Sequence, residues 1–318
     1  MMRRIFVFVV AAAGLVAAAT TTAATPIPVT PDGGAPPGFP SPPAAASNGE
    51  AWAWTQLTSR GTQIRYVTTD TTDTCPAVRY TVAGSRNPFP MRRVSGPVTG
   101  FQTTVCERAV PLGASDAVLE QSTIHAATVH PANRQLPLPN WTATTRPRSI
   151  AVIGDTGCQV PVPGSPEALQ NCQSGWPFQQ IANSAATTPQ LDLVIHVGDY
   201  LYREDPSREN DKPKNPGCTM LADSANWDCV VADFFRPAEN LLARAPVALT
   251  RGNHEDCNQF HMGGAGGAWF RYLADDLRDN RSCSDYTNSR ADQRGYPEPD
   301  LDGLCLRGRS ANTRSRAG

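Results

Sequence analysis

The sequence predicts an α/β (α+β) protein, in which an N-terminal small β domain precedes a partial domain of sheet and helix layers. Residues 49–145 carry short segments that alternate apolar with polar side chains and are separated by Gly, Pro, Asn and Asp, which is typical of strands and turns. Residues 148–286 alternate short apolar strands with segments of helical spacing, the pattern of a parallel sheet covered by helices. A chain of 318 residues has room for both domains.

The first 24 residues are predicted to be a signal peptide. Arg3 and Arg4 form a positive start, and the apolar run 5–19 is followed by small residues suited to cleavage. The alternative is a membrane anchor, but this run is shorter than the ~20 residues that a spanning helix needs. We therefore expect a secreted or periplasmic protein that has no membrane contact after signal cleavage.

Two further segments are not expected to join the core. Residues 25–48 are rich in Pro, Ala and Gly, and this composition predicts an extended linker. The tail 287–318 is rich in Arg, lacks Val, Ile and Phe, and is predicted to be disordered. The tail has the character of a truncated or out-of-frame product; a naturally short disordered tail is the alternative.

Charge and cysteine content narrow the class of protein. The formal net charge is -1, so no basic surface is available for nucleic acid or anionic lipid. Export would place the nine cysteines in an oxidising compartment. Their order suggests local disulfides, although sequence alone leaves the connectivity open: Cys75–Cys106, Cys158–Cys172, Cys218–Cys229 and Cys257–Cys283, with Cys305 left over.

Three glycine-containing turns carry the chemistry. Each follows an apolar strand of the second domain: Gly154–Gly157 (GDTG), Gly198–Tyr202 (GDYLY) and Gly252–Glu255 (GNHE). The carboxyl ends of parallel strands meet at one edge of a sheet, so the three turns should lie together. Carboxylate, amide, phenol and imidazole groups suit iron, manganese or zinc. Any one of these turns alone would be an ordinary turn.

The three turns together resemble those of the calcineurin-like metallophosphoesterases, and specifically the purple acid phosphatase branch. The resemblance covers residues 148–286 and implies a two-metal site on a β-sandwich flanked by helices. It implies that Asp155 and Tyr202 bind the first metal, that Asp199 bridges both metals and that Asn253 binds the second. His254 would contact the substrate phosphate and assist proton transfer to the leaving group.

The resemblance also implies the metals and the substrate. A phenolate ligand favours a trivalent first metal, so iron is the first choice, and the second metal would be iron, zinc or manganese. Two such cations can bind phosphate oxygens and acidify a water molecule, which suits hydrolysis of a small phosphate ester. Many family members have His at the position of Gly157, and Tyr202 would substitute for it as a ligand.

The expected ligand set is incomplete. The family pattern needs three further histidines after the third turn, and this chain has only His261 there. We therefore expect a weak second metal site and little activity from this polypeptide. A non-catalytic exported binding protein that retains the fold is the main alternative. An aspartic protease would need two Asp-Thr-Gly turns to pair two carboxylates, and only one is present.

Overall fold

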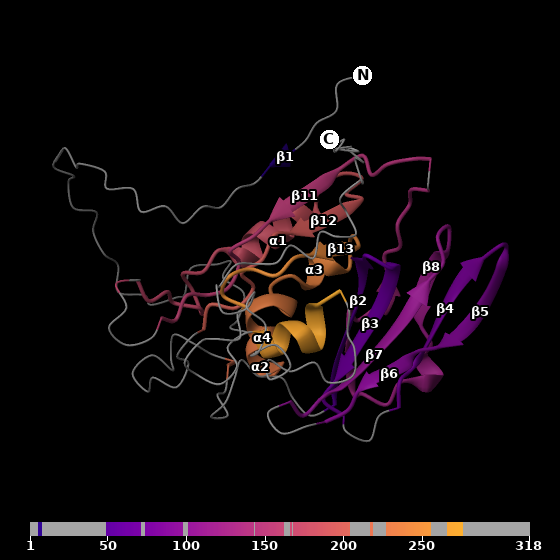
Figure 1. Cartoon of the computed structure of the whole chain (residues 1–318), viewed down its shortest axis with the longest axis horizontal. Helices are drawn as coiled ribbons and strands as arrows, with labels where there is room; N and C mark the ends of the chain where they lie inside the picture. Colours follow the sequence, from indigo (N-terminus) through magenta and orange to yellow (C-terminus); the bar gives the residue numbers. More distant parts are fainter. Residues whose placement is uncertain are drawn as a thin grey trace, which may run out of the picture.

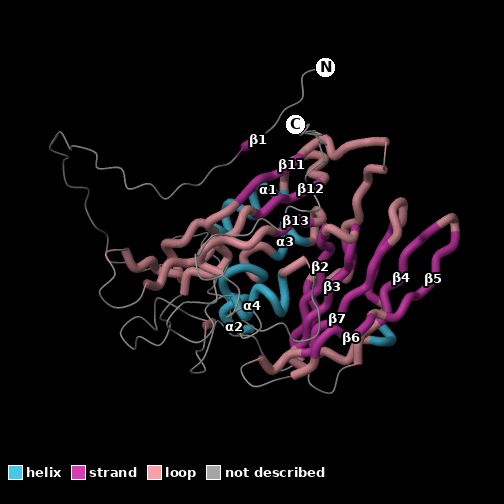
Figure 2. Tube along the Cα trace, in the orientation of Figure 1, coloured by secondary structure: helices cyan, strands magenta, loops and turns pink. Residues whose placement is uncertain are grey.

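The computed structural model describes residues 6–7, 49–70, 74–97, 101–142, 144–161, 166, 168–203, 217–218, 227–255 and 266–275. Within them a large mixed sheet lies against a small antiparallel sheet, and helices cover one face of the large sheet (Figures 1 and 2). Several predicted features lie outside the described residues. They are the signal segment apart from residues 6–7, the linker 25–48, the tail 287–318, His261, Cys305 and the Cys257–Cys283 pair.

The large sheet has the following spatial order: β1 (Phe6–Val7), β11 (Ile150–Ile153), β12 (Leu193–His196), β13 (Val247–Leu249), β2 (Glu50–Thr58), β3 (Gly61–Thr68), β7 (Thr104–Val110) and β6 (Arg92–Ser95), with β9 (Thr128–His130) also paired to β2. The small sheet has the order β10 (Gln135–Leu136), β8 (Ser115–Leu119), β4 (Ala77–Val82) and β5 (Ser85–Pro90). The helical elements are η1 (Gln121–Thr123), α1 (Phe178–Ala186), α2 (Trp227–Val230), the π-helical η3 (Val231–Phe235), α3 (Glu239–Leu242), α4 (Gly266–Ala268) and the π-helical η4 (Trp269–Leu273).

The parallel core of the large sheet confirms the predicted fold class. β11, β12 and β13 pair in parallel, and their side chains are largely apolar. β13 also pairs in parallel with β2, so strands from residues 49–145 and from residues 148–286 belong to one sheet. β1, within the predicted signal peptide, pairs with β11; removal of that segment would leave β11 as the edge strand.

The two faces of β2 build two different cores. Ala51 and Ala53 pack towards the small sheet, with Tyr66 of β3 and Tyr80 of β4. Trp52 and Trp54 pack on the opposite face, among the helices. This alternation is the period-two pattern of a strand buried on both faces. The disulfide Cys75–Cys106 adjoins the first core, and its pairing was predicted correctly.

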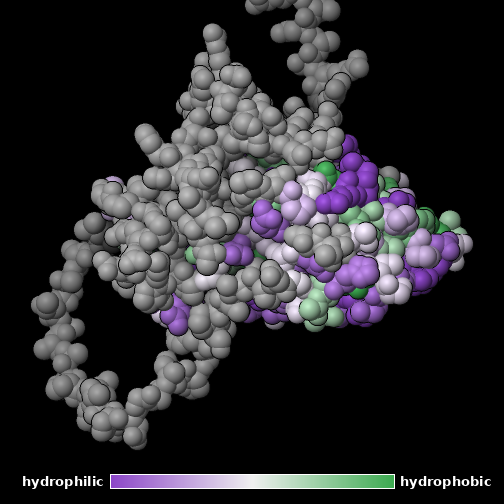
Figure 3. All heavy atoms as spheres, turned by 90° about the horizontal axis from the view of Figure 1, so that it is seen from below, coloured by the Kyte–Doolittle hydropathy of each residue, from purple (hydrophilic) through white to green (hydrophobic). Residues whose placement is uncertain are grey.

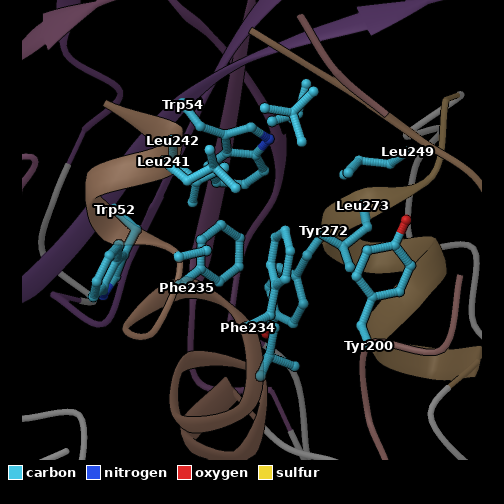
Figure 4. Close-up of a cluster of buried hydrophobic side chains, with 14 of the residues drawn as sticks. Trp52, Trp54, Tyr200, Phe234, Phe235, Leu241, Leu242, Leu249, Tyr272 and Leu273 are labelled. Atoms are coloured by element: carbon cyan, nitrogen blue, oxygen red, sulfur yellow. The ribbon is translucent and has the colours of Figure 1, made fainter. Parts of the chain in front are cut away.

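Aromatic side chains fill the core between sheet and helices. Phe235 of η3 lies against both tryptophans of β2, with ring centroids 5.7 Å from Trp52 and 4.7 Å from Trp54 (Figure 4). Leu241 and Leu242 of α3 complete this part of the cluster. Burial of one such side chain contributes about 1.5–3 kcal/mol, so the cluster is a main source of stability.

Helix α1 begins directly after Pro177. Pro177 precedes the first turn, where its fixed φ is favourable and its missing N–H costs nothing. Phe178, Ala182 and Ala185 are buried, and their spacing places them on one face of the helix. That face packs on β11 and β12, which fixes the first turn of α1 near the end of β11.

The helical segment that begins at Trp227 is interrupted at residues 236–238. It forms α2 and η3, and resumes as α3 after Pro237, which lies in the intervening turn. The disulfides Cys218–Cys229 and Cys158–Cys172 match the predicted pairs. Disulfides form in oxidising compartments, and three in one chain are consistent with an extracellular protein.

The side chain of Arg65 fastens the last described helix to the sheet. It is fully buried and donates hydrogen bonds to the carbonyl oxygens of Tyr272 (3.1 Å) and Ala274 (2.6 Å). These carbonyls end η4 and have no partner within a regular helix, so the guanidinium acts as a cap. Residues 266–275 are therefore held against β3.

The face shown in Figure 3 carries many hydrophilic residues, with hydrophobic ones among them, where it is described. In Figure 3, hydrophilic residues predominate at the end of the molecule that carries β4 and β5, and most residues of β5 are exposed. Among the described residues, no helix is both long and apolar enough to cross a bilayer.

Candidate metal centre

The three predicted turns meet at the carboxyl edge of the parallel strands. The register pairs Ile153 with His196 and His196 with Leu249, so the chain leaves all three strands at the same level. The first and second turns are joined by their backbones: the N–H of Asp155 donates to the carbonyl of Gly198 (3.1 Å), and that of Thr156 to the carbonyl of Asp199 (2.9 Å).

Glycine is required where the second and third turns touch. A Cβ atom on Gly252 would lie 2.1 Å from Oδ1 of Asp199, and one on Gly198 would lie 2.5 Å from the Cα of Gly252. Gly198 also has a φ of +105°, in the region that L side chains rarely adopt. The glycines therefore allow the carboxylate of Asp199 to lie directly against the third turn.

Both predicted carboxylate ligands have left-handed backbones. The φ angle is +53° at Asp155 and +61° at Asp199. This conformation costs roughly 1–2 kcal/mol for a residue with a Cβ, and Asp tolerates it better than most. Local strain of this kind is found preferentially at functional sites.

Tyr202 joins these two carboxylates. Its hydroxyl oxygen lies 2.9 Å from Oδ1 of Asp155 and 3.0 Å from Oδ2 of Asp199. Burial raises the pKa of the Tyr202 hydroxyl, and the charges of Asp199 and Asp155 raise it further. In the absence of a cation the phenol therefore keeps its proton and shares it between the two acids.

The other tyrosine of the second turn has a structural place. Tyr200 is fully buried, and its hydroxyl donates to the carbonyl of Thr250 at 2.8 Å. Its ring stacks on His196, with centroids 3.9 Å apart. The structure therefore places one tyrosine in the core and the other beside the carboxylates.

The third turn adds His254 and Asn253. The backbone N–H of His254 donates to Oδ1 of Asp199 at 3.0 Å, and its ring centroid is 4.1 Å from that of Tyr202. Asn253 is exposed, between Gly252 and His254 in the chain. Tyr202 thus contacts Asp155, Asp199 and His254, and Asn253 lies next to His254 along the backbone.

Glu255 organises the centre, although sequence reasoning gave it no role. Its carboxylate is completely buried and accepts the backbone N–H groups of Asp199 (2.9 Å), Tyr200 (2.7 Å), Leu201 (3.2 Å) and Gly252 (2.9 Å). Burial raises the pKa of Glu255 to about 7, and the Asp199 charge adds to this rise. The signal that could have revealed it is an acidic residue directly after a glycine turn, where backbone N–H groups need acceptors.

His196 behaves as the packed histidine that its position in a strand predicts. Burial lowers its pKa to about 3, so the ring is neutral. The N–H of Gly198 donates to Nδ1 (3.2 Å), so the ring proton is on Nε2 and donates to Oγ1 of Thr156 (2.7 Å). His196 therefore ties the first turn to the second strand from behind the centre.

A buried ion pair supports the end of the second turn. Arg203 and Asp233 are both almost fully buried, with Nε 2.5 Å from Oδ1. The other oxygen of Asp233 accepts the backbone N–H of Tyr202 at 3.3 Å. Because Asp233 belongs to η3, this pair connects the helix layer to Tyr202; the sequence gave no sign of it.

The donor set fits a hard cation. The hydroxyl oxygen of Tyr202 lies within hydrogen-bond distance of one carboxylate oxygen of Asp155 and one of Asp199, and carboxylate and phenolate oxygens suit iron or manganese. Within the described part of the chain, no group of three or more His, Cys, Asp or Glu side chains is placed to hold a metal ion. The oxygen-rich group is thus the candidate centre.

The comparison with protein families agrees with this geometry. The model of the family described as "Calcineurin-like phosphoesterase" matches residues 148–315, more than half of the chain. The chain belongs to the calcineurin-like phosphoesterase family. The match extends past residue 286, where we expected the resemblance to end. Members of this family are typically hydrolases that bind two metals and act on phosphate esters.

Among solved structures, the chain is similar to the purple acid phosphatase PPD1 from yellow lupin (Lupinus luteus) seeds. The identity is 14%, the TM-score is 0.35, and the similarity covers 70% of this chain. The chain spans 40% of the lupin protein. No curated protein matches this calcineurin-like phosphoesterase.

Proposed function

We propose that this protein is an exported metal-dependent phosphoesterase that hydrolyses small phosphate esters at a two-metal site. The observation that carries the proposal is the contact of the Tyr202 hydroxyl with both Asp155 and Asp199. Export is supported by the signal-like start of the sequence and by the three disulfides.

The residues have distinct roles in this proposal. Asp155 and Tyr202 would hold the first metal, Asp199 would serve both metals, and Asn253 would contribute to the second. The metals, when bound, supply positive charge to the phosphate oxygens and lower the pKa of a water molecule. Many family members have His where this chain has Gly157, and Tyr202 would be the ligand in its place. This exchange supports the purple acid phosphatase branch. It also supports iron as the first metal, with iron, zinc or manganese as the second.

The protein's own groups then complete the reaction. Water gives one proton to the solvent, and its oxygen forms a bond to phosphorus while the P–O bond to the alcohol breaks. His254, whose ring lies against Tyr202, contacts the phosphate and gives its proton to the departing alkoxide. Glu255 and the glycine turns hold the backbone and carboxylate of Asp199 in place.

A non-catalytic binding protein with the same fold is the second candidate. It is favoured by the scarcity of nitrogen ligands, since the 318 residues contain five histidines and only His261 follows the third turn. Few protein ligands give weak metal binding, so we expect the second metal to bind less tightly than the first and turnover by this polypeptide to be low.

The substitution Asp199→Asn tests the proposal. The matched control is Asp116→Asn, because Asp116 is exposed and has a similar left-handed φ of +56°. Each exported protein is loaded with Fe(III) and Zn(II), and metal content and hydrolysis of p-nitrophenyl phosphate are measured. We expect Asp199→Asn to lose bound metal and turnover while the control keeps both. Equal metal content and equal rates in the two variants would contradict the proposal, and metal binding without turnover in the unaltered protein would favour the binding protein.

A further inference from the structure

A pocket lies beside the candidate metal centre, between the first turn and the start of α1. Its lining includes Asp155 of the turn, Gln170, Trp176, and Phe178 and Ile181 of α1. Asp155 also accepts the hydrogen bond from Tyr202, so the pocket and the candidate centre share this carboxylate. We propose that this pocket binds the aromatic ring of an aryl phosphate, which makes aryl phosphate esters the preferred substrates; this rests on the proposed phosphoesterase function.

The walls of the pocket suit an aromatic ring. The rings of Trp176 and Phe178 have centroids 5.9 Å apart and are tilted by 49°. Phe178 is almost fully buried, whereas Trp176 and Ile181 are half-buried and accessible to a ligand. Aromatic pairs favour offset or tilted contacts of this kind, so a ligand ring gains both apolar burial and specific ring contacts.

The charge of the pocket argues against a second anionic group on the substrate. Among the described residues that line it, Asp155 is the only one with an ionisable side chain. A further phosphate or a carboxylate on the alcohol would lie close to this carboxylate, and the described lining residues include no Lys or Arg to balance it. Nucleoside di- and triphosphates and acidic alcohols are thus disfavoured relative to an uncharged aryl group.

The pocket is held open by contacts that do not depend on a ligand. The indole N–H of Trp176 donates to the carbonyl of Thr156 at 2.8 Å, which fixes the ring against the first turn. The side chain of Gln170 accepts the N–H of Gln159 at 2.9 Å, and the disulfide Cys158–Cys172 closes the same loop. A preformed site loses little entropy when a ring enters.

The test compares two phosphonates that are not hydrolysed. Binding of phenylphosphonate and of methylphosphonate to the Fe(III)- and Zn(II)-loaded protein is measured by calorimetry, and binding of 4-fluorophenol to the metal-free protein by 19F NMR. The variant Ile181→Phe fills the pocket. Ser184→Phe is the matched control, because it adds the same ring to an exposed position of α1. Thermal unfolding confirms that both variants fold.

We expect the unaltered protein and the control to bind phenylphosphonate roughly tenfold more tightly than methylphosphonate, and Ile181→Phe to abolish that preference. Equal affinities for the two phosphonates in the unaltered protein, or an unchanged preference in Ile181→Phe, would overturn the proposal. If Ile181→Phe does not fold, Ile181→Ala replaces it, and we expect its preference to shift from phenylphosphonate to 1-naphthylphosphonate; no shift would count against the pocket.

The two proposals fail in different ways. If the phosphoesterase proposal is wrong, neither phosphonate binds in a metal-dependent manner, while 4-fluorophenol still binds and is excluded by Ile181→Phe; that outcome supports the aromatic pocket. If 4-fluorophenol binds equally to Ile181→Phe and to the control while metal-dependent phosphonate binding persists, the pocket is wrong and the metal centre stands.

Discussion

The carboxylate of Glu255 accepts the backbone N–H of Asp199 at 2.9 Å. The third turn thereby fixes the backbone of the residue that we propose to bridge the two metals. The same carboxylate accepts three further N–H groups from the second and third turns, so each of its oxygens serves two donors. A buried acceptor with four donors is hard to replace.

We predict that Glu255→Gln destabilises the protein by about 2–5 kcal/mol. The amide keeps the shape of the side chain but replaces one acceptor oxygen with an NH2 group, which leaves two buried N–H groups without an acceptor. Urea unfolding measures the change. Glu120→Gln is the control, since it removes only the partly exposed ion pair with Arg79 and should cost less than about 1 kcal/mol. Similar unfolding midpoints for the two variants would contradict the role of Glu255.

Local sequence patterns predicted the parallel strands and their turns, because each feature is encoded within about ten residues. Apolar runs predicted β11, β12 and β13, and turns of glycine followed by a polar residue predicted their ends. The pairing of β2 with β13 could not be predicted in this way. It joins residues almost 200 positions apart, and no local signal specifies which edge a strand will meet.

In the candidate site too, local features could be predicted from the sequence and long-range contacts could not. Asp155, Asp199 and Tyr202 could be predicted because their side chains follow strand ends. The hydrogen-bond partners of Glu255 and the pairing of Arg203 with Asp233 could not, because they lie on segments that only the fold brings near. The acceptor of a buried N–H is set by tertiary structure and not by residue type.

We predict that Tyr202→Phe weakens binding of Fe(III) by more than about tenfold. The phenol oxygen is lost from the donor set, while the ring can still pack on His254. Because the raised pKa keeps Tyr202 protonated in the metal-free protein, metal binding to the unaltered protein should release a proton and strengthen as pH rises. Calorimetry in two buffers of different ionisation enthalpy measures both quantities.

Tyr200→Phe separates the two tyrosines of the second turn. The hydroxyl of Tyr200 donates a hydrogen bond to the carbonyl of Thr250 in the core. We therefore expect Tyr200→Phe to lower the free energy of unfolding by about 1 kcal/mol and to leave the affinity for Fe(III) unchanged. If Tyr200→Phe loses metal affinity and Tyr202→Phe does not, the assignment of the two residues is reversed.

We predict that the double variant Cys158→Ser, Cys172→Ser loses about 3 kcal/mol of stability, as expected for a bridge between residues 14 apart. It should also bind phenylphosphonate more weakly, because the loop that carries Gln170 is released. Cys75→Ser, Cys106→Ser is the control: it removes a disulfide of the distant β core and should reduce stability without changing phenylphosphonate binding. Unchanged binding in the first variant would show that the loop is held by other contacts.

His130 forms a charged link between the β region and the helix layer. Its Nε2 lies 3.0 Å from Glu50 of β2, and its Nδ1 lies 2.7 Å from Glu239 of α3. Arg236 is the remaining charged group of the cluster, 2.6 Å from Glu50, and the ring of Trp52 stacks on His130 at 4.2 Å. Burial opposes the charged form of His130, but the hydrogen bonds and charges of Glu239 and Glu50 outweigh it and raise its pKa to about 9.

We therefore predict that stability falls as the solution becomes alkaline. An unfolded histidine titrates near 6.5, so between that pH and about 9 the folded protein binds the additional proton. The stabilisation by His130 is complete below pH 6.5 and is lost as pH rises through 9, by roughly 2–3 kcal/mol.

Urea unfolding from pH 6 to pH 9.5 measures the decline. His130→Gln should be less stable at pH 6 and nearly flat between pH 8 and pH 9.5, where the titration of Glu255 is complete and the introduced amide does not titrate. His125→Gln, at an exposed histidine, should keep the slope of the unaltered protein. If His130→Gln instead retains that slope, another group causes the pH dependence, and the link between Glu50 and Glu239 does not depend on an imidazolium.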